Sequence, residues 1–347
     1  MKRSKFFVGL LLMILTLSIL LSASFKEATA QGVPKRWTIG VLSPGTSLYA
    51  IGSAFAKVIT SKSPMFCVIV PYSSTTTANL AMTEGQADMT TFHSIGAWMM
   101  AQGIGLPGNK PAYFVRVAQA GPALQFAPLV RKNSGMIYVK DMKGKRVARM
   151  ATPMQRLEID FAIANAGLTW KDVTEVPCAD VAESVKLLID GTVDVAKHAL
   201  GAPDIVKAEA AISGGVRHLS FDPSPAALSK AMEKVAPFTV SVRKAGFSTG
   251  IVEDTYVEDT ALYLATHPGA PDQAVYLAVK ALYENYKELA PAHPLLREWT
   301  PEKFVQSLGL AAPYHPGAIK FYKEVGLWKE EAQKAHEKVL KEWRQEK

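Results

Sequence analysis

The sequence predicts an α/β fold of two related lobes, each with a mostly parallel sheet flanked by helices. Strand-like apolar runs alternate with stretches of helical periodicity, which is typical of parallel sheets covered on both faces. The same order of elements occurs twice, shifted by 106 residues. In this alignment Val41 corresponds to Val147 and Thr46 to Thr152. Further apolar runs between and after the two copies can carry the chain from one lobe to the other and back.

The first copy opens with a buried strand at 38–42, a Pro-Gly turn, and a helix whose apolar residues fall on one face. The chain then continues as a strand, a polar loop, a short helix and a third strand, over residues 66–71, 72–77, 78–83 and 87–92. Where a strand is followed directly by a helix, the first N–H groups of the helix are unpaired and lie at the positive end of the helix dipole. Such a place favours an anion, although an ordinary capped turn has the same sequence.

The second copy repeats these elements over residues 146–150, 153–166, 173–177, 182–190 and 193–198. Asp88 answers to Asp194, and both are interpreted as structural turn residues rather than acid catalysts. Ligands of open parallel sheets bind beyond the carboxyl ends of the strands. We therefore expect the two strand-to-helix turns to face each other across a shared cleft.

The connections between the lobes predict a hinge. Apolar runs at 113–120 and 125–132 are joined by Gly121-Pro122, and the second run is expected to cross into lobe 2. The run at 256–266 is expected to return the chain to lobe 1. The predicted division is lobe 1 at 31–124, lobe 2 at 125–254, and the return to lobe 1 with C-terminal helices at 255–347, where a charged amphipathic helix at 328–343 packs onto lobe 1.

The N-terminus has the pattern of a secretory signal peptide. Lys2, Arg3 and Lys5 precede an apolar run at 8–23, and small residues before Ala30 form a cleavage site after that residue. The run is shorter than the roughly 20 residues that usually span a bilayer. We expect residues 1–30 to be removed and the mature protein to be periplasmic, without direct membrane insertion.

Composition and motifs argue against several functions. The net charge of +8 over 347 residues is not clustered into the basic face typical of nucleic-acid binding. The sequence has no nucleophile elbow, no phosphate-binding loop and no histidine pair with metal-ligand spacing. Cys67 and Cys178 fit neither a zinc site nor a redox pair, and the strand assignments put them on opposite edges of the fold. We expect no enzyme activity, no cofactor, no metal and no disulfide.

Five segments resemble a known family. They are SPGTSLYAIG at 43–52, Asn79-Leu80 before EGQADM, DMKGKRVA at 141–148, GAP at 201–203 and PYHPGAIKFYKEVGLW at 313–328. Together they resemble the TAXI receptors, which are the solute-binding subunits of one class of TRAP (tripartite ATP-independent periplasmic) transporters. The resemblance implies a two-lobed, type II-like periplasmic binding protein fold that closes on a small organic acid and delivers it to a TRAP permease. The alternative is a periplasmic sensory subunit that docks a membrane receptor kinase.

The sequence departs from the family at three places on the expected ligand edge. Ser74-Thr75-Thr76 stands where the family usually has Gly-Gly-Ser, and His93-Ser94-Ile95 where it has Gln-Ser-Asp. The second lobe opens with MATPMQR at 150–156 in place of a Gly-Ser-Gly-Thr turn. The glutamate and related carboxylates associated with the family therefore do not identify the ligand of this chain.

The expected strand ends and helix starts supply the candidate ligand-binding residues. Their hydroxyls, amides and imidazoles suit a carboxylate, and Arg149 could grip it with two hydrogen bonds. Phe92 could instead line an apolar wall, and the threonine run could simply cap its helix. The candidates are Ser43, Gly45, Thr46, Ser47, Tyr49, Ser74, Thr75, Thr76, Asn79, Phe92 and His93 in lobe 1, and Arg149, Thr152, Gln155, Cys178 and His198 in lobe 2.

Overall fold

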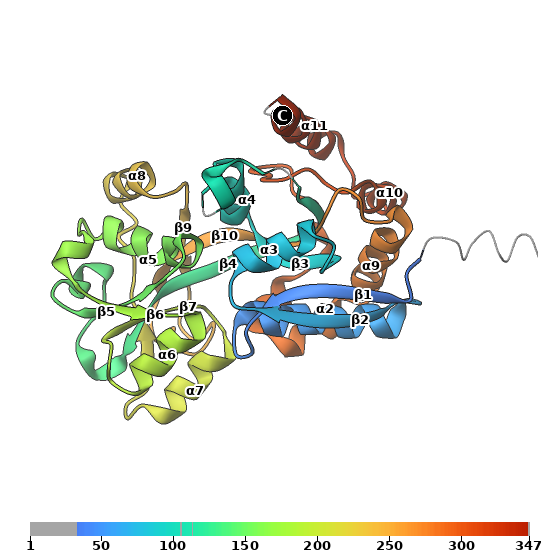
Figure 1. Cartoon of the computed structure of the whole chain (residues 1–347). Helices are drawn as coiled ribbons and strands as arrows, with labels where there is room; N and C mark the ends of the chain where they lie inside the picture. The colour runs from blue at the N-terminus through green and yellow to red at the C-terminus, as the bar shows by residue number, and fades with distance from the viewer. Residues whose placement is uncertain (1–32, 105, 113, 346–347) are drawn as a thin grey trace, which may run out of the picture.

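The computed structural model describes residues 33–104, 106–112 and 114–345, so the expected signal peptide lies outside the described residues. Figure 1 shows two lobes joined by the long strands β4 and β10. The strands are β1 (Arg36–Leu42), β2 (Phe66–Tyr72), β3 (Met89–His93), β4 (Arg116–Arg131), β5 (Arg146–Met150), β6 (Thr174–Cys178), β7 (Val195–Ala199), β8 (Val216–His218), β9 (Thr239–Arg243) and β10 (Thr255–Thr266).

Helices cover the sheet and extend from lobe 1 at the C-terminal end. They are α2 (Ser47–Lys62), α3 (Thr75–Thr83), α4 (Ser94–Ala101), α5 (Pro153–Asn165), α6 (Val181–Ile189), α7 (Pro203–Ala211), α8 (Pro225–Lys234), α9 (Asp272–Glu284), α10 (Pro316–Glu324) and α11 (Glu330–Gln345). Among the residues that the structure describes, no helix is long and apolar enough to cross a membrane.

One mixed sheet runs through both lobes in the order β2-β1-β3-β10-β4-β7-β5-β6, with β8 beside β4 and β9 beside β10. Strands β1, β2 and β3 pair in parallel in lobe 1, as β5, β6 and β7 do in lobe 2. Strands β4 and β10 are antiparallel to each other and to their neighbours β7 and β3. The predicted α/β fold with two mostly parallel lobes is confirmed.

The strand pairing corrects the repeat at its first strand. Between the two repeats, the second and third strands correspond at an offset of 106 residues, but the first strands correspond at an offset of 108. Val41 therefore corresponds to Arg149 and not to Val147. The reason is that the turn between the first strand and its helix is two residues shorter in lobe 2. The pairs that show this are Ile39 with Ile69 and Met89 in lobe 1, and Val147 with Glu175 and Val195 in lobe 2.

The prediction that Gly121-Pro122 separates two strands is wrong, because β4 continues through it. The register with β10 shifts at this point, so Gly121 and Pro122 form a bulge, where a proline without an N–H is tolerated. A Cβ on Gly121 would lie 1.8 Å from the ring of Trp299, whose indole N–H donates to Gln119 at 2.9 Å. A residue distant in sequence therefore requires this glycine in the crossing strand.

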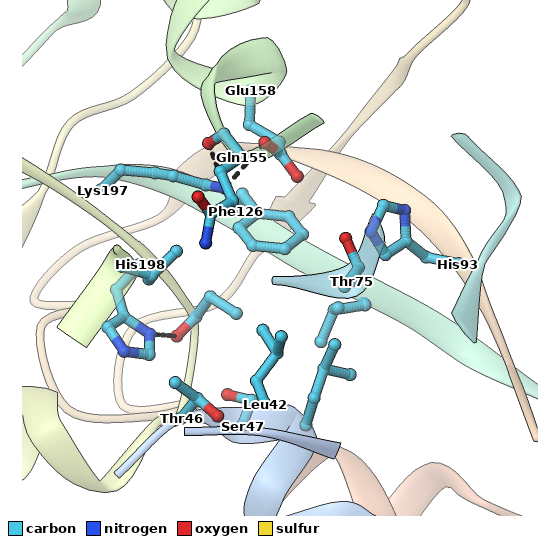
Figure 2. A pocket seen from close by; sticks show the side chains of 14 residues that line it. Leu42, Thr46, Ser47, Thr75, His93, Phe126, Gln155, Glu158, Lys197 and His198 are labelled. Atoms are coloured by element: carbon cyan, nitrogen blue, oxygen red, sulfur yellow. Dashed lines mark hydrogen bonds and ion pairs between the residues drawn. The ribbon is translucent and has the colours of Figure 1, made fainter. Parts of the chain in front are cut away.

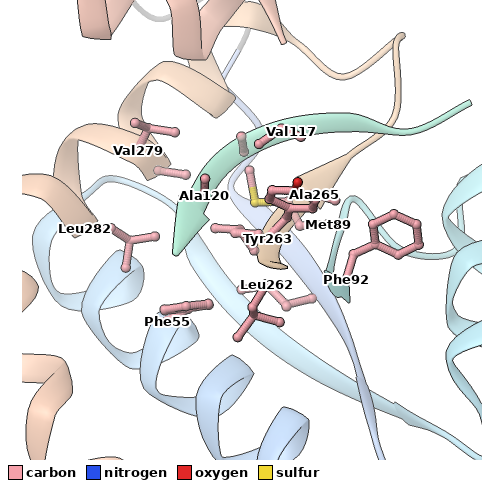
Figure 3. Packing of buried hydrophobic residues seen from close by; sticks show 14 of the residues in the cluster. Phe55, Met89, Phe92, Val117, Ala120, Leu262, Tyr263, Ala265, Val279 and Leu282 are labelled. Carbon is pink, nitrogen blue, oxygen red and sulfur yellow. The ribbon is translucent and has the colours of Figure 1, made fainter. Parts of the chain in front are cut away.

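Buried side chains form three apolar clusters, and the largest occupies lobe 1 (Figure 3). It joins Phe55 of α2, Tyr263 of β10 and Leu282 of α9 with the C-terminal helix α11, through Val339 and Trp343. The other two clusters fill lobe 2, and one includes Ile95 of α4. The exact division at 124/125 and 254/255 stays a prediction.

Two further expectations concern single segments. The predicted helix at 301–308 is only a short 3-10 turn, Pro301–Lys303, because the next backbone groups bond elsewhere. Gln306 N donates to the hydroxyl of Tyr314 at 2.7 Å, and the carbonyl of Phe304 accepts from Ala120 of β4.

The two cysteines are buried free thiols on β2 and β6, the strands at opposite ends of the sheet.

Candidate ligand cleft between the lobes

A cavity of about 30 Å³ lies between the lobes at the carboxyl ends of their parallel strands. Figure 2 shows side chains from both lobes converging on it. This volume holds roughly two water molecules, so the molecule is in a closed conformation. The lining residues are Leu42, Thr46, Ser47, Leu48, Thr75, His93, Leu124 and Phe126 from lobe 1 and the crossing strand, and Gln155, Glu158, Val181, Lys197, His198 and Ala199 from lobe 2.

Four helices begin at this cavity, two from each lobe. The first turns of α2, α3, α5 and α6 each contribute a lining residue, namely Ser47, Thr75, Gln155 and Val181. Each helix is capped by a side-chain oxygen of the preceding residue, Thr46, Ser74, Thr152 and Asp180. The positive ends of these helix dipoles converge, which favours negative charge in the cavity.

A buried ion pair forms the lobe 2 wall. Lys197 of β7 lies with its ammonium 2.7 Å from the Glu158 carboxylate of α5, and both side chains are almost fully buried. The same ammonium donates to the carbonyl of Gln155 at 2.8 Å and stands 5.0 Å from the ring centre of Phe126 (Figure 2). Removing one partner of such a pair leaves an uncompensated buried charge.

Two histidines complete the walls as neutral side chains. Burial lowers the pKa of His93 to about 4 and that of His198 to about 3. The Glu158 charge opposes the lowered pKa of His93, and the hydrogen bond to Ala199 opposes that of His198, while the Lys197 ammonium adds to the lowering of both pKa values. His93 Nδ1 accepts from the N–H of Gly96 at 3.3 Å and caps α4, and His198 Nδ1 lies 3.3 Å from the carbonyl of Ala199. At neutral pH these rings supply hydrogen bonds rather than charge.

Direct contacts between the lobes close the cavity on two sides. Gln155 Nε2 donates to the carbonyl of Ser73 at 2.8 Å, and Asp204 N donates to the carbonyl of Gly45 at 3.1 Å. Ser47 Oγ lies 3.4 Å from the carbonyl oxygen of Leu200. Gly45 has φ +94°, and a Cβ there would lie 2.3 Å from the Asp204 carboxylate. Only glycine permits this approach between α2 and α7.

The structure brings six of the predicted site residues around the cavity: Thr46, Ser47, Thr75, His93, Gln155 and His198. Four others shape the turns beside it. Ser74 and Thr152 cap α3 and α5, the carbonyl of Ser43 accepts from Thr46, and Gly45 contacts lobe 2. These four act through backbone geometry, and their side chains are not among the lining residues.

The remaining candidates lie away from the cavity. Thr76 follows Thr75 on the half-buried side of α3, while Tyr49 and Phe92 pack in or against the lobe 1 core. Asn79 is buried, with its amide nitrogen 3.8 Å from the Met100 sulfur. Cys178 packs in a lobe 2 cluster, where burial raises the pKa of its thiol to about 11. An aromatic ring does line the cavity, but it belongs to Phe126 and not to Phe92.

Arg149, the first choice for a carboxylate grip, lies outside the cavity. Its guanidinium pairs with Glu175 at 3.0 Å and stands 5.5 Å from the ring centre of Trp170, on the outer side of lobe 2. Side chains alternate along a strand, so Arg149 points away from the face on which its neighbour Met150 is buried. The shifted repeat explains the error, because Arg149 is the counterpart of a strand residue and not of a turn residue.

The sequence reasoning missed the charged half of the site. Lys197 and Glu158 both come from buried stretches that read as ordinary structural segments. The signal was a lysine inside VAKHA, a strand in which every residue is buried, since lysine is almost never fully buried unless paired. The other missed lining residues are apolar: Leu42, Leu48, Leu124, Phe126, Val181 and Ala199. Within the described ranges, no group of three or more His, Cys, Asp or Glu side chains is arranged to hold a metal ion.

Comparison with known proteins supports the fold. The family model of the NMT1-like family matches residues 39–326. A structure described as a periplasmic transporter matches with a TM-score of 0.54 and 14% identity, over 88% of this chain and 97% of that chain. The periplasmic binding protein BugD matches with a TM-score of 0.54 and 14% identity, over 87% of this chain and 98% of that chain. At this identity the likeness shows a periplasmic binding protein fold and nothing about the ligand.

Proposed function

Because the chain belongs to the NMT1-like family and has the fold of solute-binding proteins, we propose that it captures a small organic carboxylate outside the cytoplasm. The observation that carries this proposal is the cavity between the lobes, where four helix N-termini and Lys197 converge. The helix N-termini stabilise a negative charge directly. Lys197 is paired with Glu158 in the closed form, so it stabilises a ligand carboxylate by sharing its ammonium between the ligand and Glu158. The proposed role is that of a receptor, in keeping with the binding-protein fold.

The resemblance to TAXI receptors supports a finer assignment. Under this assignment, the receptor delivers its ligand to the membrane permease of a TRAP-type transporter. The signal-peptide pattern at residues 1–30 supports export to the periplasm. In this scheme the permease recognises the closed form, in which Gln155 and Asp204 of lobe 2 contact lobe 1.

Capture requires the lobes to separate and close again. The closed cavity of about 30 Å³ is too small for a carboxylate of several carbon atoms. The two crossing strands β4 and β10 form the connection about which the lobes move. The ligand would replace the direct contacts between the lobes with contacts to its own oxygens.

A thermal-shift screen of small mono- and dicarboxylates, glutarate and glutamate among them, tests the proposal. The sample is first unfolded and refolded so that any carried ligand is removed. A ligand that binds only the folded state raises Tm, and the shift grows with the logarithm of its concentration once this exceeds Kd. If no carboxylate raises Tm in the refolded protein, the proposed function is wrong.

A double variant, Lys197→Met with Glu158→Gln, locates the site. It removes the ammonium without leaving an unpaired buried carboxylate, so the fold is preserved while the Tm response is lost. Arg149→Ala serves as the matched control, because it removes a cation from the same lobe but outside the cavity. Loss of response in the control and not in the double variant would transfer the site to the outer face of lobe 2.

A further inference from the structure

Glu258 of β10 is a fully buried carboxyl group for which the receptor function gives no role. Its side chain has no exposed surface, and neither of its oxygens has a hydrogen-bond partner among the described residues. Buried carboxyl groups are normally paired or hydrogen-bonded, because burying an unpaired charge is costly. Its backbone lies opposite Phe126 and Val240 in the neighbouring strands, and neither residue carries a charge.

The charged groups around Glu258 do not balance. Its electrostatic neighbours are Glu158 from α5, Lys197 from β7 and Asp259 from β10 itself. The Lys197 ammonium is already paired with Glu158 at 2.7 Å, and Asp259 accepts from Gln125 at 2.6 Å. One ammonium thus serves two buried glutamates, Glu158 in the cavity wall and Glu258 behind it, where its strand neighbour Phe126 lines the cavity. Burial, reinforced by the Glu158 charge, raises the pKa of Glu258 well above its usual range, and Lys197 opposes this shift.

We propose that Glu258 is a proton-binding site whose occupancy is linked to closure of the lobes, an inference that rests on the proposed receptor function. In the closed molecule, water is excluded and Glu258 stays neutral by holding a proton. When the lobes separate, water reaches the Lys197–Glu158 pair and Glu258, and the carboxyl group releases its proton to solvent. Closure therefore takes up one proton at Glu258, and a low proton concentration disfavours the closed form.

Three histidines have the opposite effect: His93 and His198 line the cavity, and His293 Nε2 lies 2.9 Å from the hydroxyl of the lining residue Ser47. Burial lowers the pKa of His93, His198 and His293 to about 4, 3 and 4. In the open form these rings are hydrated and approach the ordinary value of about 6.5. They lose protons on closure, so acid favours the open form through them. In the wild type, proton uptake by Glu258 on closure and proton loss by the histidines partly cancel. Glu258→Gln removes the first effect and leaves the second.

The test is small-angle X-ray scattering of the ligand-free protein from about pH 5 to about pH 8. Glu258→Gln mimics the neutral acid, so this variant should be as compact as the wild type at acid pH and more compact at alkaline pH. The closed-to-open ratio of the wild type relative to the variant should fall by up to about tenfold per pH unit, the limit for one linked proton. Glu284→Gln, which changes an exposed glutamate of α9, should follow the wild type.

An infrared difference spectrum between wild type and Glu258→Gln at about pH 7 gives an independent reading. It should contain the carbonyl band of one protonated carboxylic acid. Absence of that band, or equal radii of gyration for the two proteins at every pH, overturns the proposal. Both measurements use ligand-free protein, so a failed ligand screen would count against the receptor function and not against the proton site.

Discussion

The two lobes build one cavity with different chemistry. Lobe 1 contributes the hydroxyls of Thr46, Ser47 and Thr75, which stand at the first turns of α2 and α3. Lobe 2 contributes a buried ion pair between Lys197 and Glu158. Neutral donors can hold ligands of many shapes. A buried ammonium that gives up its carboxylate partner needs a ligand with a negative charge in its place. We therefore propose that lobe 1 provides general affinity for oxygen-rich ligands and that lobe 2 provides selectivity.

The comparison predicts its largest effect at the ion pair. The single substitution Lys197→Met leaves Glu158 buried and unpaired, and should lower the free energy of unfolding by about 3–5 kcal/mol. Urea unfolding measures the loss, and adding Glu158→Gln should recover most of it. A loss below about 1 kcal/mol would mean that water screens the pair and that the lobe 2 wall is not dry.

A second prediction concerns acid. The folded-state pKa of His198 is depressed to about 3 by burial, so the unfolded chain binds its proton first, near the ordinary pKa. Stability from this ring is complete above about pH 6.5 and decreases as pH falls, by about 2 kcal/mol at about pH 5. His198→Gln should flatten the pH dependence of urea unfolding in that window. An unchanged slope would contradict the buried, neutral state of the ring.

A third, intermediate effect is expected where the lobes meet. Gly45→Ala places a methyl group against the Asp204 carboxylate and forces alanine to φ +94°, a backbone strain of about 1–3 kcal/mol. The clash acts on the closed form alone, because Asp204 belongs to lobe 2, so scattering should show a larger radius of gyration than wild type. Gly85→Ala is the matched control, since Gly85 has φ +72° but nothing within 4 Å of the added methyl. Equal expansion in both variants would assign the effect to backbone strain alone.

The smallest effect is predicted for Arg149→Ala. The Arg149 guanidinium pairs with Glu175 on the outer side of lobe 2, and both side chains are more than one third exposed. Such a pair contributes about 0–1 kcal/mol to stability. Calorimetric Kd values for a carboxylate found in the screen should match the wild type within about twofold, which corresponds to less than 0.5 kcal/mol. A larger loss of affinity would show that Arg149 contributes to ligand binding.

The sequence by itself determined the strands and helices of the two repeated units and their order, because hydrophobic periodicity and capping residues act locally. It identified the turn at Thr46 and Ser47, the hydroxyl of Thr75, and Gln155 at the start of α5, all of which line the cavity. These residues stand at strand-to-helix junctions, and the fold rule that ligands bind beyond strand ends was enough to find them.

The tertiary structure alone decided which charges meet. Lys197 and Glu158 are 39 positions apart on different elements, and no local pattern relates them. The same holds for Arg149, whose direction follows from a turn two residues shorter than its repeat partner, and for Gly121, which makes room for Trp299. Electrostatic energy in a dry site depends on distances of a few ångströms, and those distances exist only after the strands of both lobes have packed.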